Sequence, residues 1–157
     1  MGHDTMATTP PTAGTTRNCD TNGTQMSTTI VIGVTNQATA LKSCAQAMAL
    51  ARATDAHVHL VYAIDERDPH AESTARRHAD GLLESLALSS TLPMTVHTVI
   101  ARPDKAILQV ARDTKADLIA IGNKGMVRRG RFTRETPARV LRKAPCAVLV
   151  IDSSRAG

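Results

Sequence analysis

Two glycines, an asparagine and a lysine follow a short apolar run, and they are residue types that can hold a phosphate. The segment Gly122-Asn123-Lys124-Gly125 comes directly after Ile119-Ala120-Ile121. Glycines let backbone N–H groups approach a phosphate closely, and a lysine adds positive charge. Ligands of open α/β sheets lie beyond the carboxyl ends of strands, where this segment is expected to stand. The alternative is a strand-to-loop turn that uses the freedom of glycine at positive φ.

A second anion-attracting feature lies ten residues after Gly125. Thr136 is expected to cap a helix whose first residue is Pro137, because proline lacks an N–H that would be unpaired there. The positive end of such a helix attracts anions. Glu135 stands directly before it and can satisfy this helix end with its own carboxylate. We therefore expect Glu135 to repel a polyphosphate and to disfavour tight ATP binding.

The positive charge of the chain is concentrated in one segment. The formal net charge is +5, whereas residues 124–143 hold eight Lys and Arg and a single acid, so the remainder is net negative. A polyanion-binding module with weak, salt-sensitive association is therefore an alternative function. Specific single-strand nucleic-acid binding is disfavoured because the only large aromatics are Tyr62 and Phe132. The cations, besides Lys124, are Arg128, Arg129, Arg131, Arg134, Arg139, Arg142 and Lys143.

The sequence shows no pattern typical of catalysis or metal binding. It contains no Gly-x-Ser-x-Gly, His-Glu-x-x-His or paired-carboxylate motif, so we expect no enzyme activity. His57 and His59 share one face of a strand, but no third ligand stands at a clear spacing, and His97 is equally isolated. We therefore interpret the histidines as polar strand positions and expect no metal site.

Three widely spaced cysteines, Cys19, Cys44 and Cys146, are odd in number. They fit neither a disulfide framework nor a zinc pattern, and they indicate a reducing, cytoplasmic environment. Cys44 is expected to be a small core residue on the apolar side of a helix.

Apolar periodicity predicts a single α/β domain. Short β-branched runs, typical of buried strands, alternate with longer stretches of helical spacing. Five strands separated by four helices indicate a five-stranded parallel, doubly wound sheet with helices on both faces. The strands are expected at 29–34, 56–64, 94–100, 117–121 and 146–151. The helices are expected at 39–53, from Pro69, at 103–115 and at 137–143. In the first of these helices Leu41, Ala45, Met48 and Ala49 stand at helical spacing, and in the third the residues expected to face inward are Ile107, Leu108, Val110 and Ala111.

This arrangement predicts where a ligand would bind. If the first and fourth strands are central neighbours, the ligand crevice lies beyond their carboxyl ends. Those ends lead into residues 35–37 and 122–125, which should then face each other.

Both ends of the chain are expected to lie outside the folded domain. Residues 1–27 are dominated by Thr, Gly, Pro and Asn and predict a disordered tail without the features of a signal peptide. Met26 precedes the first strand, so translation of residues 1–25 stays open. We expect the domain at 28–152 and a flexible C-terminus at 153–157. No apolar stretch approaches the length of a membrane span.

Three segments resemble the universal stress protein (UspA-like) family across about residues 28–152. They begin with IVIGVTNQATALKSCAQAMALARATDAHVHLVYAI, continue with ADLIAIGNKGM and end with ARVLRKAPCAVLVID. The Gly-Asn-Lys-Gly-Met form is similar to actinobacterial members, some of which bind adenine nucleotides, including cyclic AMP. The resemblance implies strand order 3-2-1-4-5 and homodimers joined through the last strand. It also implies adenine-nucleotide binding where a Gly-x2-Gly-x9-Gly-(Ser/Thr) motif is kept.

The chain departs from that nucleotide motif. Gly122 and Gly125 match, but the third glycine falls on Glu135, followed by an acceptable Thr136. A second register places Arg134 on the glycine and Glu135 on the serine. After the first strand, the aspartate of ATP-binding members is replaced by Thr35. We therefore expect a non-enzymatic stress-response regulator with a degenerate or altered adenine-nucleotide pocket. A functional ATP-, AMP- or cyclic-AMP-binding member is an alternative.

The positions of the expected sites follow from this match to the nucleotide motif of the family. An adenine base would lie between Val34-Thr35 and the second strand, with its phosphate over Gly122, Gly125 and Thr136, and Asn123 and Lys124 are further candidates. The last strand, Ala147-Val148-Leu149-Val150-Ile151, carries none of the charges that protect a sheet edge. An exposed apolar edge favours pairing with a second copy of the chain, which agrees with the dimer that the resemblance implies.

Overall fold

The structure, a computed structural model, describes most of the expected domain. It covers residues 27–34, 38–64, 91–123 and 136–152. Between residues 64 and 91 it also covers 70, 72–73, 76–77, 80–81 and 85. At 38–41 it describes the backbone alone. Residues 1–26 and 153–157, which the sequence predicts to be a tail and a flexible end, lie outside this description. The bounds of the folded domain therefore stay predictions.

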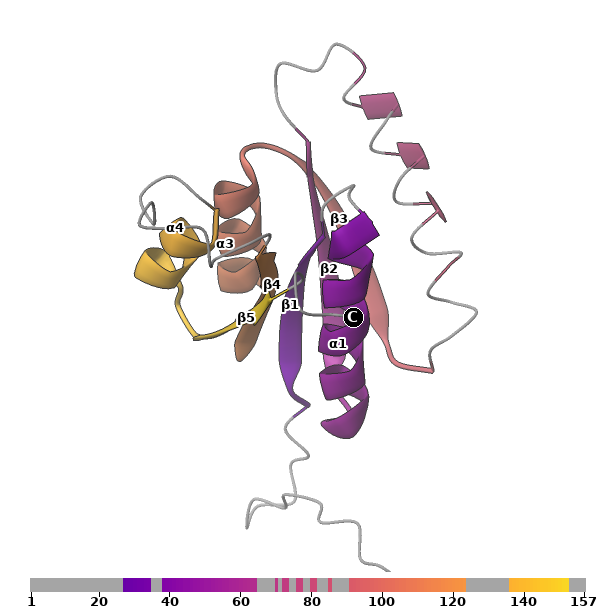
Figure 1. The fold of residues 1–157 in the computed structure, drawn as a ribbon, viewed down its shortest axis with the longest axis vertical. Coiled ribbons are helices and arrows are strands. Elements are labelled where there is room, and N and C mark those ends of the chain that lie inside the picture. The colour runs from indigo at the N-terminus through magenta and orange to yellow at the C-terminus, as the bar shows by residue number, and fades with distance from the viewer. Residues whose placement is uncertain are drawn as a thin grey trace, which may run out of the picture.

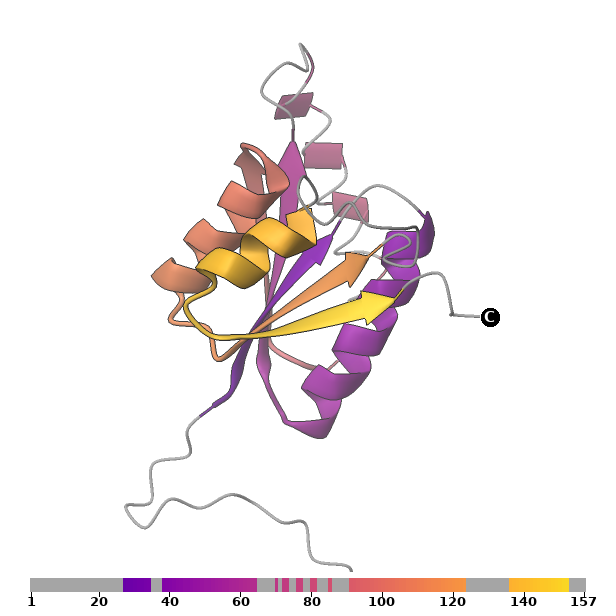
Figure 2. The same ribbon diagram turned by 60° about the vertical axis from the view of Figure 1, so that its left-hand side comes forward.

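Eight helices and strands in the described ranges form an α/β fold. The five strands make one parallel sheet of order β3-β2-β1-β4-β5, which confirms the predicted fold class and strand order. Helix α1 covers one face, and α3 and α4 cover the other (Figures 1 and 2). The elements are β1 (Thr29–Val34), α1 (Ala38–Ala53), β2 (His57–Ile64), β3 (Met94–Ile100), α3 (Pro103–Asp113), β4 (Leu118–Asn123), α4 (Thr136–Lys143) and β5 (Ala147–Asp152).

Alternate residues of each strand feed two separate cores. Ile30 and Ile32 of β1 pack with α1, whose buried face comprises Cys44, Ala47, Met48 and Ala51. This corrects the expected stripe of α1, because Ala45 and Ala49 are exposed. The helix is rich in alanine on every side, so its sequence offers too little contrast to locate the inward face.

The second core lies between the sheet and α3. All four side chains expected to face inward from α3 are buried there, together with Val31 of β1 and Val61 of β2. Gly33 of β1 allows this close packing, since a Cβ atom at that position would lie 2.6 Å from Cδ1 of Ile107. The glycine therefore sets how near α3 comes to the centre of the sheet.

Strand β4 runs further than its apolar pattern indicates. It continues through Asn123 because Gly122 pairs with Ile151 and Asn123 pairs with Asp152 in β5. The first half of the expected phosphate loop is therefore strand. The other predicted bounds differ by one or two residues at most, and the described residues after Pro69 include helical backbone at 72–73, 76–77, 80–81 and 85.

Helices α1 and α3 end in the same turn. Asp55 and Lys115 both have positive φ, 51° and 52°. The next residue then donates a backbone hydrogen bond into the last helical turn, from Ala56 to Ala51 O at 3.0 Å and from Ala116 to Ala111 O at 2.9 Å. Glycine is the usual residue at this left-handed position, because a side chain makes that conformation costly.

Replacing Lys115 by glycine should therefore stabilise the fold. We expect Lys115→Gly to raise the free energy of unfolding by about 0.5–1 kcal/mol in urea denaturation. The matched control is Arg112→Gly in the last turn of α3, where φ is helical and the same replacement should lower stability by about 1 kcal/mol. Equal losses in both variants would contradict the role of the positive φ.

Candidate functional site

The carboxyl ends of β1 and β4 meet at the centre of the sheet. The two strands pair in parallel from Ile30–Leu118 to Gly33–Ile121, and Val34 and Gly122 follow directly after this last pair. In Figure 2 the arrowheads of β1, β4 and β5 point to the same edge. The chain continues from β1 into α1 on one face, and α4, which follows β4, lies on the other. Such a switch point is where doubly wound sheets form ligand crevices.

The structure describes half of the predicted nucleotide-binding residues. Val34 is buried at the end of β1, Gly122 and Asn123 are the last two residues of β4, and Thr136 is the first residue of α4. The helix thus begins one residue earlier than expected, and Thr136 belongs to it. The other four candidates, Thr35, Lys124, Gly125 and Glu135, lie outside the described residues, so their roles stay predictions.

Gly122 is held in place by α1. A Cβ atom at Gly122 would lie 2.7 Å from Oγ and 3.0 Å from Cβ of Ser43, a buried residue of α1. Real Cβ atoms do not approach other atoms so closely, so a larger residue would require Ser43 or the helix that carries it to shift. The φ of Gly122 lies outside the left-handed region, which makes the alternative of a positive-φ turn wrong at this position. A packing requirement therefore explains this glycine.

Asn123 places a polar side chain in the interior at the crevice. Its side chain is only 2% exposed, although the sequence indicated a loop residue. Because side chains alternate along a strand, Asn123 points to the face opposite Ser43 and α1. The strand pairing with Asp152 of β5 holds its backbone. A buried amide at the end of a central strand brings both a donor and an acceptor to the crevice.

A buried carboxylate that the sequence analysis missed joins α3 to α4. Asp104 is 5% exposed in the first turn of α3. It accepts two hydrogen bonds from Arg102, Nε to Oδ1 at 3.1 Å and Nη2 to Oδ2 at 2.7 Å. Nη1 of Arg139 in α4 lies 3.7 Å from Oδ1. The sequence offered one signal for this contact, an acidic residue in the first helical turn after Pro103. Its partner in α4 is 35 residues away along the chain, so the sequence alone did not indicate the pairing.

The two arginines keep Asp104 ionised. Burial by itself would raise the pKa of the carboxyl group, but the hydrogen bonds and charge of Arg102 and the charge of Arg139 outweigh it. The net effect lowers the pKa of Asp104 below its usual range. The carboxylate is therefore negative at neutral pH and holds the start of α3 against α4.

The predicted polyanion segment is described only in α4. Arg139 is half-buried and lies against Asp104, which removes it from a free cationic surface. Arg142 and Lys143 are exposed in the last turn. Arg128, Arg129, Arg131, Arg134 and Lys124 lie outside the described residues. No described part of the segment has the aromatic side chains that stack on bases.

The cysteines of the described ranges are structural. Cys44 is buried in the core under α1, as expected, and burial raises the pKa of its thiol. Cys146 is half-buried, with a pKa raised by burial and by the charge of Asp117. Cys19 lies outside the description. Among the described residues, no three His, Cys, Asp or Glu side chains are grouped to hold a metal ion, and no helix is long and apolar enough to span a membrane.

The five residues predicted to join two copies of the chain lie on the edge strand β5. Its edge position is confirmed by the strand order. Ile151 is buried under α1, whereas Leu149 is 36% exposed on the same face. Ala147, Val148 and Val150 are uncharged as well, so Asp152 at the end of β5 is the one charge on this edge strand. The dimer itself stays a prediction.

Comparison with known proteins gives one consistent result. Residues 26–152 match the model described as the universal stress protein family. The Thermus aquaticus protein named "Universal stress protein in QAH/OAS sulfhydrylase 3'region" is 29% identical over an alignment of 133 residues, and the match covers 78% of this chain and 97% of that protein. The universal stress protein UspA from Lactobacillus plantarum has a similar structure, with a TM-score of 0.64 at 21% identity over 79% of this chain and 97% of that one.

A second solved structure is more similar in sequence. It is a universal stress protein in complex with cAMP, with a TM-score of 0.65 at 25% identity. The match covers 81% of this chain and 98% of that chain.

The contribution of Asp104 to stability should depend on pH in a predictable direction. Because its pKa is lower in the folded state, its stabilisation is present above the pKa of the unfolded state, about 3.9, and is lost as pH falls through the folded pKa. We expect Asp104→Asn to lower the unfolding free energy by about 1–3 kcal/mol at pH 7 and by less at pH 3.

Urea denaturation of wild type and variant at pH 7, 5 and 3 measures this difference. The control is Asp113→Asn, which changes an exposed carboxylate at the other end of α3. If Asp104→Asn lowered the unfolding free energy by the same amount at pH 3 and at pH 7, the charge of Asp104 would not be what joins the helices.

Proposed function

The chain belongs to the universal stress protein family, and from that premise we propose that it is a non-enzymatic, cytoplasmic stress-response regulator with an altered adenine-nucleotide pocket. The pocket is the crevice at the carboxyl ends of β1 and β4. It favours a nucleotide with a single phosphate, AMP or cyclic AMP, over ATP.

The observation that carries this proposal is the pairing of β1 with β4. Its last pair, Gly33 with Ile121, directly precedes Val34, a candidate contact of the base, and Gly122, the first glycine of the nucleotide motif. Gly125 follows three residues later, so its backbone N–H stands close in sequence to the same edge. A solved relative with this fold, 25% identical, is a complex with cAMP. The same ligand class therefore suits this crevice.

The preference for one phosphate rests on the start of α4. A helix N-terminus attracts anions through its free N–H groups. Glu135 directly precedes Thr136, the first residue of α4, and stands where the family motif has a glycine. A carboxylate at this point competes for the same donors and repels phosphate. The repulsion grows with ligand charge, so it disfavours ATP more than a cyclic monophosphate.

The proposal assigns no chemical step to the pocket. Hydrolysis of a nucleotide needs a general base or a metal-binding carboxylate near the phosphates. The one described carboxylate that is buried, Asp104, is engaged by Arg102 and Arg139. Binding then acts by shifting the conformation of the protein or its association with a partner.

We further propose that two copies pair through β5. Leu149 and the neighbouring residues of this edge strand are apolar and uncharged. An edge of this kind leaves backbone N–H and C=O groups available to a second strand, and its side chains gain from burial. A homodimer satisfies both requirements.

Nucleotide titration by calorimetry tests the pocket. We expect wild type to bind cyclic AMP or AMP more tightly than ATP, and Glu135→Gly to strengthen ATP binding at least tenfold, about 1.4 kcal/mol. Glu135→Gln, which removes the charge but keeps the bulk, should give part of that gain. Tight ATP binding by wild type, unchanged in Glu135→Gly, would eliminate the altered pocket.

Light scattering tests the dimer. We expect wild type to have the mass of two chains and Leu149→Lys to have the mass of one, because a charge on β5 opposes strand pairing. The matched control is Ile100→Lys on β3, the opposite edge strand of the sheet, where isoleucine is 50% exposed. Dissociation by both variants, or by neither, would count against pairing through β5.

A further inference from the structure

Three histidines form one patch across β2 and β3. The rings of His57 and His59 are stacked, with centroids 4.5 Å apart and planes 7° from parallel. The ring of His97 lies 5.1 Å from that of His59. The expectation that His97 is isolated was therefore wrong. The parallel register of the two strands, which pairs His59 with Thr95 and Val61 with His97, brings the rings together.

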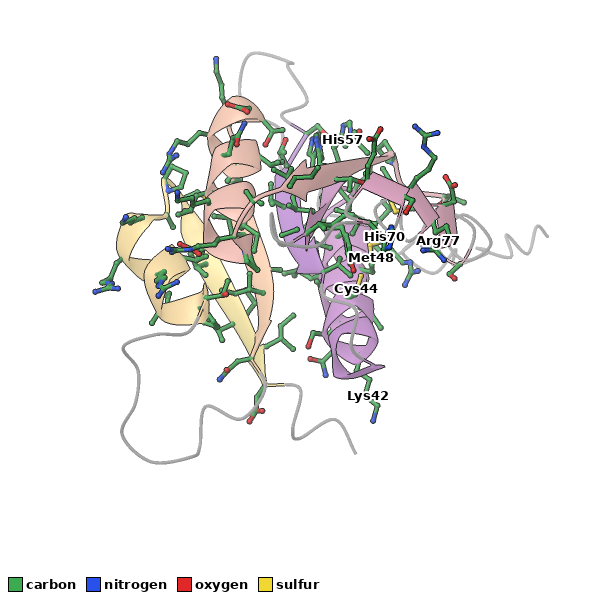
Figure 3. All side chains as sticks on the ribbon, turned by 90° about the horizontal axis from the view of Figure 1, so that it is seen from above. Lys42, Cys44, Met48, His57, His70 and Arg77 are labelled. Carbon is green, nitrogen blue, oxygen red and sulfur yellow. The ribbon has the colours of Figure 1, made fainter. Side chains whose placement is uncertain are left out.

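The patch lies on the face of the sheet that α3 covers. Val58 and Leu60 point toward α1, so the alternate residues His57 and His59 point the other way. Figure 3 shows His57 on the side of the strands away from Cys44 and Met48 of α1. All three rings are only half-buried, and β3 is an edge strand, so ions from solvent reach them.

Two ring nitrogens in the patch converge. Nδ1 of His59 and Nε2 of His97 are 2.9 Å apart and share a hydrogen bond, one as donor and the other as acceptor. With metal–nitrogen bonds of about 2.0–2.1 Å, adjacent ligands of a tetragonal ion stand about 2.9 Å apart, and tetrahedral ligands about 3.3–3.4 Å. The observed separation is that of the hydrogen bond, and it already equals the tetragonal spacing. The hydrogen bond lies along the line between the two nitrogens, so each ring would have to turn by about 45° for both lone pairs to face one ion.

We propose that His59 and His97 form a two-histidine site for a divalent ion that prefers tetragonal nitrogen coordination, Cu²⁺ or Ni²⁺. No third His, Cys, Asp or Glu among the described residues joins them, so water completes the coordination. The ion takes the place of the shared proton, which moves to the other nitrogen of its own ring. It would link the edge strand β3 to β2. The site lies apart from the nucleotide crevice and does not depend on the proposed function.

His57 is a positioning residue for this site. Its ring stacks on that of His59, and its Nε2 lies 3.2 Å from Oγ1 of Thr95 in β3. These contacts keep the His59 ring beside that of His97. Preorganised ligands bind a metal more tightly because less freedom is lost on binding.

The carboxylate of Asp113 acts electrostatically on His97, and its negative charge favours a cation beside that ring.

Calorimetric titration with Cu²⁺ in a glycine-containing buffer at pH 7 tests the site. All proteins carry His3→Ala, because a histidine in third position from an amino terminus chelates Cu²⁺ by itself. We expect one Cu²⁺ per chain, and a loss of affinity of at least tenfold in His59→Gln and in His97→Gln. His57→Gln should weaken binding less, and His70→Gln, which changes an exposed histidine elsewhere, should have no effect.

Two further measurements keep the test independent of the stability of the variants. Electron paramagnetic resonance of the bound Cu²⁺ should show two coupled imidazole nitrogens, and saturating Cu²⁺ should raise Tm of the parent protein but not of His97→Gln. Zn²⁺, which prefers tetrahedral ligands, should bind at least tenfold more weakly than Cu²⁺. Unchanged Cu²⁺ affinity in folded His59→Gln and His97→Gln, or a spectrum without two imidazole nitrogens, would overturn the site.

Discussion

Two helices contact the backbone of the central strands at glycines, and this close approach positions the remaining elements. On one face Cδ1 of Ile107 in α3 lies 2.6 Å from where a Cβ atom of Gly33 would be, and on the other Oγ of Ser43 in α1 lies 2.7 Å from where that of Gly122 would be. The two glycines stand on paired strands, β1 and β4. Packing from both sides therefore converges on the centre of the sheet, where an added methyl group would require the contacting side chain or its helix to shift. The two cores on either side depend on these contacts.

The close contact with Ser43 changes the functional interpretation of Gly122. A glycine at the end of a strand, in a family with a solved cAMP complex, could be attributed to ligand binding alone. Here the contact with Ser43 requires the glycine with or without a ligand, and the pairing of Gly122 with Ile151 makes it part of the strand. Nucleotide binding is therefore inferred from the meeting of the carboxyl ends of β1 and β4. The altered preference is inferred from Glu135, which stands where the family motif has a glycine.

Polar groups mark two separate regions of the molecule. Asp104, held between Arg102 and Arg139, joins the starts of α3 and α4 near the carboxyl ends of the strands. The histidine patch lies on β2 and β3, beginning at His57, the first residue of β2. Each region joins elements that are distant in the chain. The two regions therefore involve different contacts, α3 with α4 in one case and β2 with β3 in the other.

Local pattern alone determined the strands at 29–34 and 94–100, the inward residues of α3 and the apolar character of β5, since each depends on the residue types within one element. The strand order came from the family resemblance. Only the tertiary structure decided the buried face of α1, because alanine stands on all its sides. The extension of β4 to Asn123 depends on pairing with β5, and the meeting of His59 with His97 depends on the register of β2 and β3. Likewise, Asp104 meets Arg139 only when α3 packs beside α4. Periodicity encodes which face of an element is buried, whereas register and helix packing encode which side chains of different elements touch.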